Sequence, residues 1–437
     1  MEIITIHLEE KFGKFKPLNA TNGAPIYKRY TNDQLRSNFT AYKQARIPYS
    51  RNHDMNSVGA YGGPFVHDIS AIFPNFDADE NDPNNYDFAC TDESILATLD
   101  AGTKTFFRLG QTIEHQIKKH HTLPPKDFAK WARICERIIR HYTEGWANGF
   151  KLDMPYWEIW NEPDLDTDDC KSKRTWGGVK TEFFDLYEVA SKHLKACFPH
   201  LKIGGPALAF REDWAESFLC EMQKRGVEID FFSWHIYAET PEEVVKKAKS
   251  IRGMLDRYGY ESAESILNEW NYVRGWTDEY IYSLEQIHGI KGACFIMSVF
   301  TMSQQTPDID MLMYYDTRLS VFNGVFDFYT LRPLKGYYPF LWYGEFYDME
   351  YEVRAEQTHE ELYTLCGVDK AGKTTAIITH YSKDDEKSPI QVSVELKKDT
   401  EYKVYLLDKD HDGEYIKTTK DLQFTMPVHS CIMIKEK

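Results

Sequence analysis

From about residue 90 to residue 300 the sequence alternates between strand-like and helix-like segments, and this alternation constrains the fold more than any other feature. The run "PKDFAKWARICERIIRHYTEG" is typical of the helices, because its apolar side chains recur at helical spacing. The strand-like runs are "TKTFFRLG", "PYWEIWNE", "LKIGGP", "IDFFSWHIY" and "ESILNEW". We expect one more strand in "KGACFIMSVF", residues 291–300.

Two earlier segments, "FKPLNATNG" and "QARIPYSRNH", are candidates for the first two strands and bring the count to eight. Eight parallel strands alternating with helices predict an α/β fold, a (β/α)8 TIM barrel, which we place at residues 12–335. An open doubly wound sheet is the competing topology. It usually carries a Gly-rich dinucleotide turn after its first strand, and this sequence has none.

After about residue 335 the pattern changes to short alternating runs such as "TTAIITHYS" and "IQVSVELK". Such runs predict antiparallel strands joined by polar turns. We therefore expect a C-terminal antiparallel β-sandwich domain at residues 336–437, which the opening segment, residues 1–11, can join as a further strand.

Composition excludes several classes of partner. The chain has 52 basic and 68 acidic residues, and its net charge of −16 disfavours binding to nucleic acid. The longest apolar run, "GACFIMSVFTM", is too short to span a membrane, and the N-terminus shows no signal peptide. Eight cysteines without paired spacing favour a reducing compartment. We expect a soluble, cytoplasmic protein without membrane contact, or a secreted or periplasmic one if a signal was removed, and a homo-oligomer stays open.

Two glutamates stand where predicted strands end. Glu162 follows the fourth strand in "WEIWNEP", and Glu269 ends the seventh strand in "SILNEW". In a barrel of parallel strands, the C-terminal strand ends form one mouth. Two carboxylates in one mouth are what glycoside hydrolysis requires, and an apolar setting should raise the pKa of Glu162 as a general acid needs. A single buried Glu is more often an ion-pair partner, but two at equivalent strand ends favour catalysis.

Other polar side chains share these strand ends. His235 and Tyr237 lie two apart on the sixth strand and so point to the same face, as do Arg51 and His53 on the second. A guanidinium from Arg51 near Glu269 would keep that carboxylate ionised, as a nucleophile must be. The alternative is that His235 is a hydrogen-bonded core residue and Arg51 a structural ion-pair partner.

Motifs for cofactors and metals fail on their context. "GVDKAGKT" has the spacing of a P-loop, but its flanks are both strand-like, whereas a P-loop must open a helix. "DKDHDG" begins like a calcium loop, yet its twelfth position is Thr419 where a bidentate Glu is needed. We therefore expect no cofactor and no metal.

"WNEP", a strand-end "NEW", "RNH", "GGP" and "WHIY" together resemble glycoside hydrolase family 39 of clan A, which holds β-xylosidases and α-L-iduronidases. The resemblance covers almost the whole chain, since family members also carry a β-sandwich after the barrel. It implies Glu162 as acid/base, Asn161 as the contact to the sugar 2-hydroxyl, and Glu269 as nucleophile. It also implies Arg51 as the support of the nucleophile, and His53, His235 and Tyr237 as lining of the subsite for the non-reducing sugar.

The chain departs from the family pattern after the last strand. Family xylosidases place a Trp and an adjacent pair of acids there, whereas "QQTPDIDMLMYYDTRLSVFNG" offers Asp308, Asp310, Tyr314 and Asp316. We take Asp310 and Tyr314 as substrate-binding candidates. The departure leaves the identity of the sugar open.

The sequence thus predicts a retaining, β-xylosidase-like glycosidase that cleaves short oligosaccharides or glycosides. One alternative is a non-catalytic carbohydrate-binding protein on a glycosidase scaffold. Another is a metal-dependent barrel hydrolase that uses His53, Asp54, His235 and Glu269.

Overall fold

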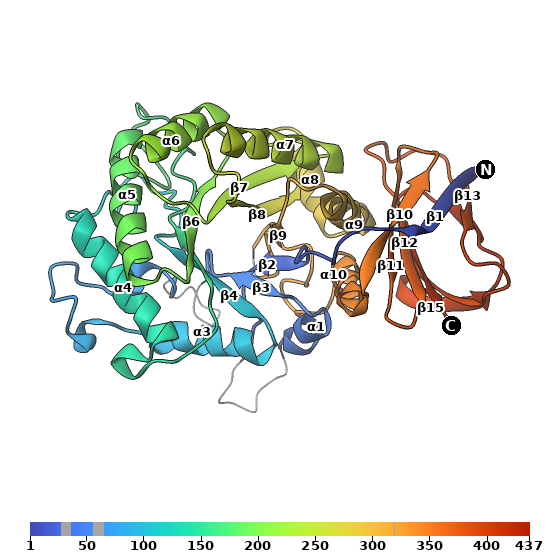
Figure 1. Cartoon of the computed structure of the whole chain (residues 1–437), viewed down its shortest axis with the longest axis horizontal. Helices are drawn as coiled ribbons and strands as arrows, with labels where there is room; N and C mark the ends of the chain where they lie inside the picture. Colours follow the sequence, from blue (N-terminus) through green and yellow to red (C-terminus); the bar gives the residue numbers. More distant parts are fainter. Residues whose placement is uncertain (28–35, 56–64, 319) are drawn as a thin grey trace.

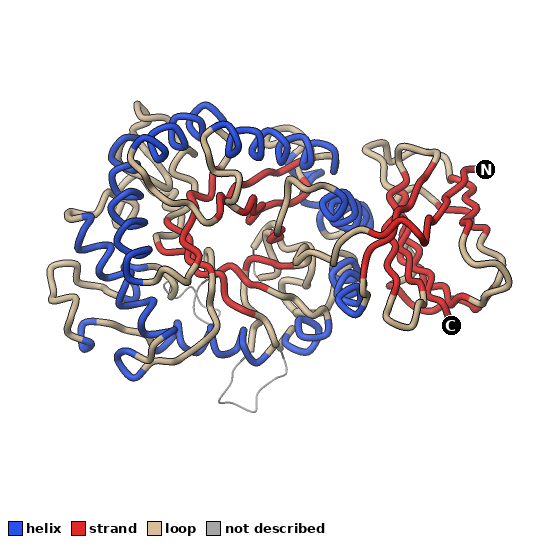
Figure 2. Tube along the Cα trace, viewed as in Figure 1, coloured by secondary structure: helices blue, strands red, loops and turns tan. Residues whose placement is uncertain are grey.

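A barrel and a separate sheet make up the chain in its computed structural model, which describes residues 1–27, 36–55, 65–318 and 320–437. Figure 1 shows the barrel on the left and the sheet on the right, with both chain ends on the sheet. In Figure 2 the barrel strands form an inner ring and helices surround them. The predicted TIM barrel followed by a β-sandwich is confirmed. Among the described residues, no helix has the length and apolar character needed to cross a bilayer.

Eight parallel strands close the barrel in chain order. They are β2 (Ala20–Asn22), β3 (Tyr49–Arg51), β4 (Lys104–Leu109), β5 (Tyr156–Ile159), β6 (Lys202–Leu208), β7 (Phe231–Ala238), β8 (Glu264–Tyr272) and β9 (Met311–Tyr314). The helices between and after them are α1 (Phe39–Gln44), α2 (Ile69–Ile72), α3 (Ala89–Asp100), α4 (Phe128–Thr143), α5 (Lys180–Cys197), α6 (Glu212–Lys224), α7 (Pro241–Arg257), α8 (Tyr280–Ile287), α9 (Ile290–Gln305) and α10 (Tyr337–Glu345). Single 3₁₀ turns lie at η1 (Pro83–Asn85), η2 (Trp146–Asn148) and η3 (Phe346–Asp348).

The predicted strand at residues 291–300 is wrong, because this segment lies within helix α9, and the eighth strand is β9. α9 contacts the barrel helices α7, α8 and α10 on one side and the sheet strands β11 and β12 on the other. It is therefore buried along almost its whole length. A helix that is apolar all round has no amphipathic period, so periodicity could not separate it from a buried strand.

Two layers of side chains fill the barrel interior below the C-terminal strand ends. The lower layer is apolar and consists of Ala20, Phe106, Tyr156, Phe231, Ile266, Met311 and Met313. The next layer towards the strand ends is polar and fully or nearly fully buried, with residues from β2, β3, β5, β7 and β8: Asn22, Arg51, Glu158, Ser233 and Asn268. This polar layer lies directly beneath the strand ends that carry the predicted site.

The second unit is a nine-stranded sheet in the order β15-β14-β17-β12-β11-β10-β1-β13-β16. Its strands are β1 (Glu2–Lys11), β10 (Tyr351–Gln357), β11 (Leu362–Val368), β12 (Thr374–His380), β13 (Ile390–Glu395), β14 (Tyr402–Leu407), β15 (Asp412–Thr419), β16 (Gln423–Met426) and β17 (Ser430–Glu436). Neighbouring strands are antiparallel except β1 and β13. Strands from both ends of the order share one apolar cluster, so the sheet folds over its own core.

The predicted boundary between residues 335 and 336 stays a prediction. Helix α10 lies beyond this boundary but packs against α9, and the first sheet strand after the barrel, β10, begins at Tyr351. β1 lies in the sheet, although barrel strands follow it in the chain.

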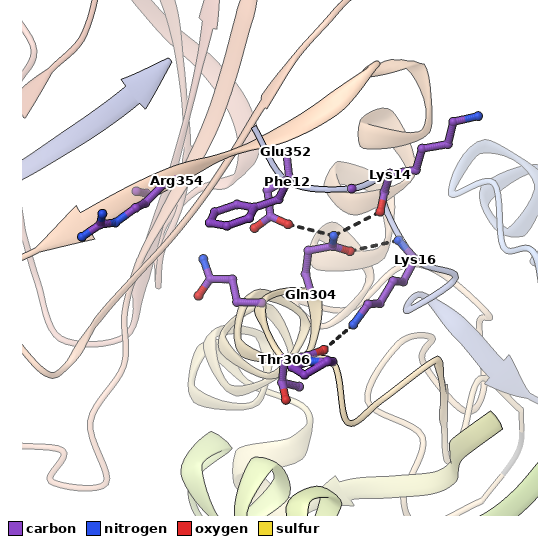
Figure 3. Close-up of a pocket in the computed structure, with 11 residues that line it drawn as sticks. Phe12, Lys14, Lys16, Gln304, Thr306, Glu352 and Arg354 are labelled. Carbon is purple, nitrogen blue, oxygen red and sulfur yellow. Dashed lines mark hydrogen bonds between the residues drawn. The ribbon is translucent and has the colours of Figure 1, made fainter. Parts of the chain in front are cut away.

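Gln304, near the end of α9, connects the barrel to the sheet across a crevice of about 390 Å³ (Figure 3). Its amide nitrogen donates to Glu352 on β10 at 2.9 Å, and its amide oxygen accepts from the backbone N–H of Lys16 at 2.9 Å. The Lys16 ammonium donates to the carbonyl of Ile309 at 2.9 Å. These bonds tie the segment after β1, the barrel and the sheet together on the side of α9.

Candidate active site

The backbone turns sharply after β5 and so presents Glu162 at the barrel mouth. Trp160 and Glu162 have φ angles of 74° and 49°, in the left-handed region that residues with a side chain rarely adopt. Each such residue costs about 1–3 kcal/mol, which the surroundings must supply. The N–H of Glu162 donates to Ala207 at 2.9 Å, its carbonyl accepts from the Thr175 hydroxyl, and Trp160 donates to Leu109 at 2.7 Å.

A β-bulge in β8 aims Glu269 into the same mouth. Leu267 pairs with Trp234 on β7, and Glu269 pairs with the next residue, His235, so that Asn268 is the extra residue. A bulge breaks the strict alternation of side chains along a strand. As a result Asn268 and Glu269, although adjacent, both contact groups in the barrel interior.

The structure brings Glu162, His235 and Glu269 together. One oxygen from each carboxylate and one nitrogen of His235 all lie within 4.8 Å of one another. His235 Nδ1 is 2.8 Å from Glu162 Oε1 and 3.7 Å from Glu269 Oε2. The glutamate side chains keep 13% and 8% of their exposure, so both carboxylates still reach the mouth.

Arg51 and Tyr237 hold the carboxylate of Glu269. Arg51 Nη1 lies 3.3 Å from Oε2, and the Tyr237 hydroxyl donates to Oε1 at 2.8 Å. Arg51 also donates from Nη2 to Asn161 Oδ1 at 2.6 Å. Because this bond fixes the amide orientation, the NH₂ group of Asn161 is the part turned away from Arg51.

Burial raises the pKa values of both glutamates, and the two values differ only modestly. It raises the pKa of Glu162 to about 8, with a further rise from Asp164 and an opposing effect of Arg51. It raises the pKa of Glu269 to about 7, against the effects of Arg51 and the Tyr237 hydroxyl. Arg51 therefore does not fully offset burial, and Glu269 loses its proton before Glu162 does. Burial lowers the pKa of His235 to about 4, which leaves its imidazole neutral at pH 7.

His53 lies beside the carboxylate cluster. Its Nε2 is 4.0 Å from Glu269 Oε2 and 3.3 Å from Asp54 Oδ1. Burial lowers its pKa well below the usual value, so the imidazole is neutral. Asp54 in turn accepts from the Tyr315 hydroxyl at 3.0 Å. The structure thus brings together Arg51, His53, Asn161, Glu162, His235, Tyr237 and Glu269.

The structure does not bring Asp310 and Tyr314, the other two predicted substrate-binding residues, into this cluster. Asp310 precedes β9, and its carboxylate accepts from the N–H of Ser265 at the start of β8, 2.7 Å away. It therefore lies at the opposite, N-terminal end of the barrel. The Tyr314 ring packs outward against Trp270 and Phe340. Both positions follow from the misassigned strand, because the segment taken as the loop after the last strand holds Asp310 and β9 itself.

Aromatic side chains on one side of the mouth form a group that sequence reasoning missed. Trp276, in the loop after β8, is 57% exposed, and its ring lies 5.1 Å from that of Tyr237. Phe322, from the loop after β9, lies 5.3 Å from Tyr237 and 6.0 Å from Trp276. Both residues follow the ends of barrel strands, and this position in the sequence could have indicated them. Exposed aromatic rings at a site suit sugar stacking.

A polar cavity of about 360 Å³ lies among the loops after β3 and β4. His121 lines this cavity together with Thr112 and Glu114. The cavity wall is linked to the loop after β5, because the N–H of Glu114 donates at 2.9 Å to the carbonyl of Arg174, the residue before Thr175.

Two groups of described residues have the donor types and spacing for a metal ion. One is the cluster of Glu162, His235 and Glu269. Arg51 already places a cation against Glu269, which disfavours a divalent ion there. The other is Glu136, His193 and Cys197 on the outer surface of α4 and α5, where Arg140 donates to Glu136 at 2.7 Å.

Two curated β-xylosidases match part of this chain. A β-xylosidase of Geobacillus stearothermophilus is 26% identical over 216 residues, which cover 43% of this chain and 41% of that protein. A β-xylosidase of Caldicellulosiruptor saccharolyticus is 28% identical over 237 residues, 49% and 45% of the two chains. The chain therefore matches less than half the length of each relative.

The crystal structure of a glucosidase from Croceicoccus marinus has the same fold, with a TM-score of 0.79, 20% identity, and coverage of 100% of this chain and 99% of that one. The sequence model of glycosyl hydrolases family 39 matches residues 16–275, more than half of the chain. The chain belongs to glycosyl hydrolases family 39.

Proposed function

We propose that the protein is a retaining glycosidase that cleaves short oligosaccharides or glycosides. The observation that carries this proposal is the approach of Glu162 and Glu269, whose nearest oxygens lie within 4.8 Å. Retaining enzymes place their carboxyl groups about 5–5.5 Å apart, whereas inverting enzymes need about 6.5–9.5 Å to admit a water molecule. The short separation supports direct attack by one carboxylate.

The contacts of each glutamate favour one assignment of roles. Glu269, whose two oxygens meet Arg51 and Tyr237, loses its proton first and attacks the anomeric carbon. Glu162, with a pKa of about 8, keeps its proton at pH 7 and gives it to the departing oxygen. The product of this step is a glycosyl ester of Glu269. Water, deprotonated by Glu162, then attacks the same carbon and releases Glu269.

Neighbouring side chains position the sugar in this proposal. The NH₂ group of Asn161, turned away from Arg51, donates to a sugar hydroxyl beside the reacting carbon. One ring nitrogen each of His53 and His235 is buried in this site and has no partner among the described residues. The reaction uses two carboxylates and water, and no step calls for a metal or cofactor.

β-Xylosides are the substrates to test first, because both relatives named above are β-xylosidases. The rates at which the protein hydrolyses a panel of aryl glycosides with different sugars test whether xylosides are preferred. Binding of sugars without hydrolysis of any of them would favour the non-catalytic alternative. Loss of activity on chelation would favour a metal-dependent hydrolase.

A matched pair of variants tests the two roles with an activated aryl glycoside and added azide. For Glu269→Ala we expect loss of activity, and rescue by azide as a glycosyl azide of inverted configuration. For Glu162→Ala we expect azide to give a glycosyl azide of retained configuration, because the nucleophile is still present. Full activity of Glu269→Ala without azide would overturn the proposal.

We also propose that the protein resides in a reducing, cytoplasmic compartment, which the eight free cysteines support. Cell fractionation with a reporter for thiol state tests this proposal.

A further inference from the structure

Glu158, on β5, is a fully buried carboxylate beneath the candidate catalytic pair. Its Oε2 accepts from Arg51 Nε at 2.7 Å. Its Oε1 accepts from the Ser233 hydroxyl at 2.6 Å and from the Asn268 amide. Donors from β3, β7 and β8 thus converge on this carboxylate. A buried carboxylate with three donors, one of them a guanidinium, is held rigidly in place.

The contact with Glu158 decides how Arg51 uses its other N–H groups. Nη1 donates to Asn22 Oδ1 at 3.2 Å and to Glu269 Oε2 at 3.3 Å, and Nη2 donates to Asn161 Oδ1 at 2.6 Å. An Arg that faces a single carboxylate normally forms a bidentate pair with it. Here the shortest carboxylate contact goes to Glu158, so Glu269 receives one N–H only and the opposite edge of the guanidinium reaches Asn161.

We propose that Glu158 is a positioning residue that holds Arg51 between Glu269 and Asn161 and neutralises part of its charge. The inference rests on the proposed glycosidase function. Without this negative charge the full charge of Arg51 would act on both Glu269 and Glu162. Glu162 would then lose its proton at a lower pH and would be a less available acid above neutrality.

The charged and titratable groups around Glu269 come from three strands, β3, β5 and β7, and the loops after them. They are Arg51, His53, Asp54, Glu162, His235 and Tyr237. Both imidazoles are neutral at pH 7, because burial lowers their pKa values. Arg51 is therefore the cation through which a change at Glu158 reaches the pair.

The substitution Glu158→Gln isolates the charge, because glutamine keeps an acceptor for Arg51 Nε. Its NH₂ group can donate to Asn268 Oδ1, which has no partner among the described residues. We expect both limbs of the kcat/KM profile to move to lower pH by about 0.5–1 unit, with the rate at pH 8 falling about 2–5-fold. KM should change less than kcat, since Glu158 touches no substrate.

Glu158→Ala removes the acceptor as well, and we expect a larger loss of kcat that Glu158→Gln partly restores. The matched control is Glu352→Gln, a buried carboxylate of the sheet, which should leave the profile unchanged. A folded Glu158→Gln variant with the wild-type profile, in an active wild-type background, would overturn the positioning role alone. A wild-type protein inert on every glycoside would instead refute the proposed function.

Discussion

The hydroxyl of Tyr237 donates a 2.8 Å hydrogen bond to Oε1 of Glu269, the carboxylate oxygen that Arg51 does not contact. Arg51 reaches the other oxygen, Oε2, at 3.3 Å. The two donors come from β7 and β3, on either side of the barrel mouth. Rotation of the Glu269 carboxylate would break at least one of these contacts, so its orientation is set before any substrate binds.

Loss of this hydroxyl in Tyr237→Phe should lower kcat/KM about 10–100-fold, because a hydrogen bond to a charged group contributes about 1.5–3 kcal/mol. The same bond lowers the pKa of Glu269, so its loss should move the acidic limb of the profile to higher pH. Tyr314→Phe is the control, since Tyr314 packs against helix residues. An unchanged acidic limb in Tyr237→Phe would contradict the effect of this hydrogen bond on the pKa of Glu269.

The pH profile of the wild type should be a narrow bell. Activity requires Glu269 ionised and Glu162 protonated, so it rises as pH passes about 7 and falls as pH passes about 8. The two limbs describe the coupled pair and not either glutamate alone. The alkaline limb should disappear in Glu162→Ala with a leaving group acidic enough to depart unprotonated. Persistence of that limb would assign it to another residue.

Replacing Glu162 by Gln should stabilise the fold more at pH 8 than at pH 5. The folded chain binds the Glu162 proton more tightly than the unfolded chain, with a pKa of about 8 against 4.5. Wild-type stability therefore falls as pH rises from about 4.5 towards 8, and glutamine escapes this loss. We expect a gain of about 2–4 kcal/mol in the free energy of unfolding at pH 8. Denaturant titrations at both pH values check it, with Glu228→Gln on the surface as control.

Trp276→Ala should weaken substrate binding, because the exposed indole stands next to Tyr237 at the mouth. We expect KM to rise about tenfold, or about 1.4 kcal/mol, with a smaller change in kcat. Trp276→Phe should retain most of the affinity. Tyr415→Ala, which removes an exposed ring from the sheet, should leave KM and kcat unchanged. Equal KM values for Trp276→Ala and the wild type would exclude Trp276 from the binding surface.

The alternation of strands and helices, and the glutamates at the ends of the fourth and seventh strands, could be read from the sequence alone. These features are local, because side-chain periodicity reports which face of a segment is buried. Closure of parallel strands then forces their C-terminal ends to one rim. For this reason Glu162 and Glu269, far apart in the chain, could be placed together before any coordinates were known.

Tertiary structure alone decided which partners these groups meet. Helix α9, residues 290–305, is covered by the barrel on one side and by the sheet on the other, so its sequence carries no amphipathic period. The bulge at Asn268 turns two successive side chains inward, and Arg51 is divided between Glu158, Asn161 and Glu269. Such contacts join strands distant in the chain, and their distances follow from how the closed barrel is packed.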